Sequence, residues 1–234
     1  THGVPEAART SQHVVSPAAI AAIERFVIVA NVRLIRRRKN MINRILLVCV
    51  LALSGAAHAG PFGLDMGMRL ADVEKQAQLK PAAPYVYSTP SLPNGHPDFN
   101  DYRLLITPQH GLCKVSAWTP HLSTGVYGTQ LQDAYDRLFR ALTAKYGNGK
   151  KYDFLLAGSI WGESKDWMMA LLRKERTLVT FWTPKEVNLP DNIGSIKLEA
   201  EASSTDEGEI SLAYEFKNSS DCIGWIAAHK NSNL

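Results

Sequence analysis

The chain has 234 residues, and its 26 Lys and Arg outnumber its 22 Asp and Glu. Residues 1–59 hold eight of these bases and two of the acids, which leaves 18 bases and 20 acids in residues 60–234. This remainder lacks the net positive charge that attracts DNA, RNA or anionic lipid, so we exclude nucleic acid as a partner. Its length of 175 residues predicts one domain with its own core.

Residues 41–59 have the pattern of a signal peptide. Arg44 precedes an uncharged apolar run at 45–53, and Ala57 and Ala59 are the small residues that a signal peptidase reads. The run is much shorter than the ~20 apolar residues that span a bilayer. We expect cleavage before Gly60, a periplasmic or secreted destination, and no membrane span in the mature chain.

Residues 1–40 precede this signal and carry a basic run at 36–39. They are either an upstream over-extension of the reading frame, with Met41 as the true first residue, or a long n-region of the signal. In both cases they leave with the signal. The working protein is then a single exported domain at 60–234.

Cys113 and Cys222 are the two cysteines that follow the signal, since Cys49 lies inside it. An oxidising destination favours a disulfide between them, with the Cα atoms within about 7 Å. The alternative is a pair of buried free thiols.

The domain opens with a short strand and turn at 61–68, followed by a helix on which Leu70, Val73 and Ala77 recur at helical spacing and which Pro81 ends. The opening Gly67-Met68-x-x-x-x-Val73 resembles that of small exported bacterial α+β proteins, namely the outer-membrane assembly lipoproteins and the β-lactamase-inhibitor-like modules. The resemblance implies an α+β fold and assigns no functional residue.

Residues 80–101 are rich in proline, serine, asparagine and glycine, so we predict a loop with a short strand at 85–87. Long loops often carry function. Residues 102–107 and 113–117 then alternate between apolar and polar residues on either side of a turn at 108–111. This pattern predicts a β-hairpin.

The strongest helical pattern runs from Thr129 to Tyr146, with an apolar stripe at Leu131, Tyr135, Leu138, Leu142 and Tyr146. Thr129 and Gln132 predict a capping box at its start, and Gly147 predicts its end. Two ion pairs are expected on its solvent-exposed face, Asp133 with Arg137 and Asp136 with Arg140. A shorter helix follows Ser164.

Three strands are predicted at 177–182, 195–203 and 209–217. The last two alternate with their even-numbered apolar residues on one face, so an antiparallel pair needs opposed residue numbers with an even sum. We predict a sum of 412, which opposes Leu198 to Tyr214 and Lys197 to Glu215. The expected fold is α+β, a two-layer arrangement with an antiparallel sheet and helices packed on one face.

No complete catalytic constellation is found in the sequence. Around Ser159, alanine and tryptophan replace the two glycines of a nucleophile elbow, so a loop is the better interpretation. Cys113 lies in a predicted strand rather than at a helix start, which favours the disulfide over a reactive thiol. We therefore predict no catalytic residue and no cofactor.

Metal ligation is considered for His96, Asp98, His110 and His121, because imidazole and carboxylate groups are the usual zinc ligands. Their spacing contains no second histidine at helical or strand-alternate distance. We therefore predict no metal site.

The five tryptophans all follow the signal. Trp167 and Trp182 lie on periodic apolar faces and are predicted to be core. The sequence does not assign Trp118 and Trp161 to the core in this way. They are possible ligand-contact aromatics, since aromatic rings stack on glycans and anchor protein interfaces.

Taken together, these patterns favour an exported, non-catalytic binding or inhibitor-like module of the bacterial envelope, with an unknown protein or cell-wall ligand as its partner. The alternative is an envelope hydrolase acting on cell-wall polymer or a small ester. In that case the loop at 80–101 would meet the segment around Ser159 in a deep pocket.

Overall fold

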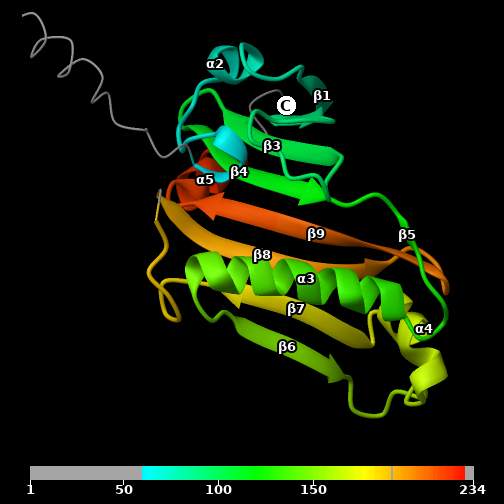
Figure 1. Cartoon of the computed structure of the whole chain (residues 1–234). Helices are drawn as coiled ribbons and strands as arrows, with labels where there is room; N and C mark the ends of the chain where they lie inside the picture. Colours follow the sequence, from blue (N-terminus) through cyan, green and yellow to red (C-terminus); the bar gives the residue numbers. More distant parts are fainter. Residues whose placement is uncertain (1–59, 191, 230–234) are drawn as a thin grey trace, which may run out of the picture. The chain divides into compact units, whose positions relative to one another are not determined.

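The structure, a computed structural model, describes residues 60–190 and 192–229. The predicted signal at 41–59 and residues 1–40 lie outside this part. Within it, a mostly antiparallel sheet is combined with several helices, so the fold is α+β, as the sequence predicts (Figure 1). No helix in the described ranges is both long enough and apolar enough to cross a bilayer.

The sheet consists of two four-stranded meanders and one short addition. Its strands are β1 (Lys80–Ala83), β2 (Val86–Thr89), β3 (Asp101–Thr107), β4 (Gly111–Trp118), β5 (Leu122–Ser123), β6 (Lys150–Leu155), β7 (Arg176–Trp182), β8 (Ile193–Ala202) and β9 (Glu207–Phe216). Their order is β1-β2-β3-β4-β9-β8-β7-β6, with β5 paired to one end of β9. The last strands of the two meanders, β4 and β9, therefore meet at the centre of the sheet.

The helices lie before, within and after these meanders. They are η1 (Pro61–Gly63), α2 (Leu70–Glu74), α3 (Thr129–Tyr146), η2 (Ser164–Asp166), α4 (Trp167–Leu172) and α5 (Ser219–His229). α3 runs across β8 and β9, and α4 contacts β7 and β8 (Figure 1). α5 instead contacts β4.

α3 has the bounds that its apolar stripe predicts, and Gly147 ends it through an N–H bond to the carbonyl of Thr143. All five stripe residues are buried. The predicted capping box is wrong, because the N-cap is Gly128 with φ 67°. A Cβ there would lie 2.2 Å from the Trp167 ring, so the packing of α4 requires glycine at this position.

The ion pairs predicted within α3 are also wrong. Arg137 pairs with Asp98 from the preceding loop at 3.1 Å, and Asp136 pairs with Lys151 of β6 at 3.3 Å. Arg137 and Asp136 of α3 thus bond to other segments of the fold. These bonds tie the helix to the first meander and to β6.

The predicted faces of β8 and β9 are correct, but the register is shifted by two residues. Leu198 opposes Leu212, Ala200 opposes Ile210, and Lys197 opposes Ala213 rather than Glu215. Glu215 instead accepts a bond from Lys114 of β4 at 2.9 Å. The strands close at Ala202 and Gly208, where a Cβ on Gly208 would lie 2.7 Å from the Leu131 side chain of α3. The approach of α3 therefore requires glycine near the end of the hairpin.

The predicted disulfide is confirmed. Cys113 of β4 and Cys222 of α5 are bonded across 109 residues of sequence, with their Cα atoms 6.5 Å apart. Tyr85 and Trp225 add an edge-on ring contact at 5.1 Å between the start of β2 and α5. α5 is thus joined to the first meander, although its residues follow the second.

Four elements were not predicted from the sequence: β1, β5, β6 and α5. The strand predicted within 61–68 is wrong, because residues 61–63 form the 3-10 helix η1, which the N–H of Leu64 closes by donating to the carbonyl of Pro61. β1 contains Pro81 and is an edge strand, the place where a sheet tolerates proline. β6 is the opposite edge and is almost fully exposed, so its alternation carries no strong apolar signal. The predicted loop at 80–101 is therefore shorter, and runs from residue 90 to residue 100.

Candidate functional site

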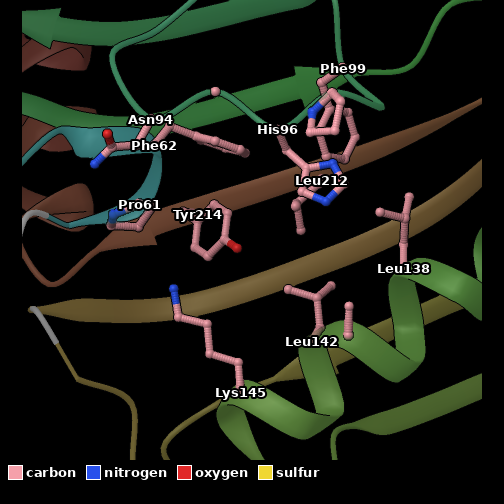
Figure 2. Close-up of a pocket in the computed structure, with 13 residues that line it drawn as sticks. Pro61, Phe62, Asn94, His96, Phe99, Leu138, Leu142, Lys145, Leu212 and Tyr214 are labelled. Carbon is pink, nitrogen blue, oxygen red and sulfur yellow. The ribbon is translucent and has the colours of Figure 1, made fainter.

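A cavity of about 260 Å³ lies between the loop at 94–99 and α3 (Figure 2). β9 forms its floor with Leu212 and Tyr214. One wall comes from α3, and the other comes from the loop together with η1. Its lining residues are Pro61, Phe62, Asn94, Gly95, His96, Pro97, Phe99, Leu138, Ala141, Leu142, Lys145, Leu212 and Tyr214. The pocket thus lies near the centre of the sheet, where the two meanders meet.

The loop wall is held in place by a buried tyrosine beneath it. Tyr102 of β3 accepts a hydrogen bond from the backbone N–H of His96 at 3.1 Å and lies 3.3 Å from the carbonyl of the same residue. A Cβ on Gly95 would lie 3.1 Å from that hydroxyl, so a larger residue would crowd it. The Asp98–Arg137 ion pair also joins the loop to α3.

Phe62 forms part of the same wall in a strained backbone conformation. Its φ of 56° lies in the left-handed region, which costs a residue with a side chain roughly 1–3 kcal/mol. Its ring makes edge-on contacts with Phe99, Tyr102 and Tyr214 at centroid distances of 6.0, 5.1 and 5.5 Å. Aromatic pairs contribute about 0.5–1.5 kcal/mol each, so these contacts offset the strain.

Tyr214 provides a polar group on the floor. Burial, followed by the neighbouring Tyr146, raises the pKa of Tyr214 well above its ordinary value. The phenol therefore keeps its proton at neutral pH, and the interaction with Tyr146 favours this protonated form. Figure 2 shows its hydroxyl among the apolar side chains of the pocket.

The charge at the opening comes from Lys145 in the last turn of α3. Figure 2 shows this side chain extending from α3 toward β9. Its Nζ lies 5.0 Å from the centre of the Tyr146 ring, and it has no carboxylate partner within the part of the chain that the structure describes. None of the 13 described residues that line the pocket is acidic.

His96 lies on the opposite wall from Lys145. Its Nδ1 accepts a bond from the backbone N–H of Asp98 at 3.2 Å. A neutral ring in this arrangement carries its proton on Nε2, and an Nε2–H group is a donor. Lys145 and His96 thus offer donors around an apolar space, and the protonated Tyr214 phenol lies on its floor.

Ser159 lies outside this pocket, in the loop after β6. Its hydroxyl accepts a bond from the backbone N–H of Trp161 at 3.2 Å, and among the described residues it has no histidine or carboxylate partner. The pocket that the 94–99 loop lines includes no residue of the Ser159 segment.

The two candidate aromatics are found on separate elements. Trp118 ends β4 and is half-buried, with the Arg103 guanidinium 4.7 Å from the centre of its ring. Trp161 is half-buried in the loop before η2. Neither residue lines the pocket.

The four residues considered for metal ligation do not come together. Asp98 bonds to Arg137, His121 lies 3.3 Å from the Ser203 hydroxyl, and His110 lies in the β3–β4 turn. Within residues 60–190 and 192–229, no group of three or more histidine, cysteine or acidic side chains could hold a metal ion.

No family model, curated protein or solved structure matches this chain.

Sequence reasoning missed Phe62, Lys145 and Tyr214 as site residues. A signal for Lys145 does exist, because Leu138, Leu142 and Lys145 are spaced at i, i+4 and i+7 on one face of a helix. A lysine that continues an apolar stripe is a candidate to lie at the opening of an apolar pocket. Phe62 has no such signal, since its part depends on contacts with residues far away in the sequence.

Proposed function

We propose that this protein is an exported, non-catalytic binding module of the bacterial envelope, and that the pocket between the 94–99 loop and α3 is its ligand site. The observation that carries the proposal is a preformed apolar cavity with a few donor groups directed at it, the usual make-up of a small-ligand site. Around it, the described residues include no nucleophile paired with a base.

Export is supported by two features. The pattern at 41–59 is that of a cleaved signal, and a disulfide such as Cys113–Cys222 persists in an oxidising compartment. A periplasmic or secreted location is part of the proposal.

The proposal also includes two-layer packing for α3 and α4, which would cover the even-numbered face of β8 and β9. Ile196, Leu198 and Leu212 on that face are buried. On the other face, Lys197 pairs with Glu199. α5, which the disulfide attaches to β4, lies outside this two-layer scheme.

The proposal can be tested by blocking the pocket. Ala141 lines it but is exposed on α3, so Ala141→Phe should fill the space without disturbing the core. Ala144→Phe is the matched control, because Ala144 is exposed on the same helix and does not line the pocket.

The full chain and both variants would be incubated with a low-molecular-mass extract of bacterial envelope and examined by native mass spectrometry. We expect a bound species on the wild type and Ala144→Phe that is absent from Ala141→Phe. Turnover of an aryl ester that disappears in Ser159→Ala would instead establish the hydrolase alternative and overturn the proposal.

A further inference from the structure

We infer that the pocket selects a small apolar carboxylate, with an aromatic or branched aliphatic body in the cavity and the carboxylate at Lys145. This inference rests on the proposed binding function and adds the ligand class. It is carried by the combination of an apolar space, a cation without a carboxylate partner in the described part, and a lining with no acidic residue.

The apolar body is matched by the middle of the pocket. Leu138 and Leu142 come from α3, Leu212 from β9, and the rings of Phe62 and Phe99 face them from the other wall (Figure 2). At about 260 Å³ the cavity lies just below the range of roughly 300–1,000 Å³ that is usual for drug-sized ligands. It therefore suits a single ring or a short branched chain.

The sign of the ligand charge follows from the groups at the opening. Lys145 carries an ammonium group, the His96 ring presents Nε2–H because its Nδ1 accepts from Asp98, and burial favours the protonated form of the Tyr214 phenol. A carboxylate accepts bonds from all of these donor types, whereas a cationic ligand would meet Lys145 as a like charge.

The other nearby charges do not reverse this preference. Asp98, the carboxylate of the loop wall, is already paired with Arg137 at 3.1 Å. Lys145 lies beside an aromatic ring rather than a carboxylate, with its Nζ 5.0 Å from the centre of the Tyr146 ring. The opening therefore presents net positive charge to a ligand.

Three probes of nearly equal shape and different charge test the inference: benzoate, benzamide and benzylammonium. Binding to the full chain would be followed through the methyl NMR signals of Leu138, Leu142 and Leu212. For a ligand of this size we expect a dissociation constant of roughly 1–10 mM for benzoate. Benzamide should bind about three- to tenfold more weakly, and benzylammonium more weakly still.

Two variants test whether Lys145 causes the preference for benzoate over benzamide. Lys145→Met keeps an unbranched side chain and removes the charge, so the preference for benzoate over benzamide should fall to nearly onefold. Lys197→Met on the other face of the sheet is the control and should leave the ratio unchanged. Added salt at about 1 M should reduce the wild-type ratio, because it screens exposed charges.

The outcomes separate this inference from the proposed function. Equal binding of benzoate and benzamide, lost in Ala141→Phe, would overturn the carboxylate preference and leave the pocket as a binding site. Binding of none of the probes, or binding that Ala141→Phe does not change, would overturn both. A preference that persists in Lys145→Met would overturn the assignment of the charge to Lys145.

Discussion

Gly208 shows how a single residue sets the geometry of a long hairpin. A Cβ at this position would lie 2.6 Å from the carbonyl oxygen of Glu201 and 2.7 Å from the Leu131 side chain. β8 and β9 can therefore lie beneath the first turn of α3 only where the side chain is absent.

We expect Gly208→Ala to lower the free energy of unfolding by roughly 1–3 kcal/mol, because an added methyl group overpacks this contact. Urea denaturation followed by circular dichroism would measure the change. Gly162→Ala is the control, since a Cβ there meets no atom within 4 Å, and it should change stability by less than about 0.5 kcal/mol. Equal losses in the two variants would contradict the account of Gly208.

The expected cleavage before Gly60 would change an interaction at the first residue of the domain. The backbone N–H of Gly60 donates to Asp65 Oδ1 at 2.9 Å. Cleavage would convert this amide into an α-ammonium group, so the hydrogen bond would become an ion pair.

Asp65→Asn should therefore destabilise the mature chain more than the full chain, by roughly 0.5–1 kcal/mol for an exposed pair. The measurement is urea denaturation of both lengths with and without the substitution. An equal cost in both lengths would argue against the ion pair, and sequencing of the exported protein from another first residue would remove its basis.

At the scale of elements, α5 depends on the disulfide for its place. Only two of its residues, Ser219 and Cys222, are buried. Trp225 also contacts the ring of Tyr85, in the turn before β2. Cys222 therefore supplies much of the attachment.

We expect replacement of both cysteines by alanine to lower the free energy of unfolding by roughly 2–4 kcal/mol, because the bond closes a long loop in the unfolded chain. Hydrogen exchange should rise first in α5, while the amides of β8 and β9 stay protected at low denaturant. Unchanged exchange in α5 would show that its packing suffices without the bond.

Across the whole molecule, buried tyrosines should make the folded state less stable at alkaline pH. Burial raises the pKa of Tyr102, Tyr135 and Tyr214, and the Thr180 hydroxyl bonds to Tyr135 at 2.7 Å. An unfolded tyrosine ionises near pH 10, whereas these phenols keep their protons to higher pH. Above about pH 10 the folded state thus binds more protons than the unfolded state, and stability falls as pH rises.

We expect the free energy of unfolding to be similar at pH 7 and pH 9 and roughly 1–3 kcal/mol lower at pH 11, as measured by urea denaturation. Tyr135→Phe should cost about 1–2 kcal/mol at pH 7, since Thr180 loses its partner. The difference in unfolding free energy between Tyr135→Phe and the wild type should become smaller at pH 11. Wild-type stability that does not fall between pH 9 and pH 11 would contradict this prediction.

Local periodicity in the sequence is enough to predict several features of the fold. The apolar stripe of Thr129–Tyr146 predicted the bounds of α3, and the alternation in β8 and β9 predicted which side chains share a face. The two cysteines that follow the predicted signal also predict the Cys113–Cys222 bond. Each of these follows from the period of a helix, the period of a strand or the count of a residue type, and none requires knowledge of the distant neighbours.

The strand register, the partners of Arg137 and Asp136, and the pocket depend on long-range packing, which local patterns do not reveal. A shift of two residues keeps every apolar side chain on its face, so the strand pattern alone did not distinguish the observed register from the predicted one. In the observed register a Cβ on Gly208 would lie 2.7 Å from the Leu131 side chain, and Leu131 belongs to another element. The pocket likewise forms where Phe62, His96, Lys145 and Tyr214 meet, and side chains that far apart in the sequence are brought together by the fold.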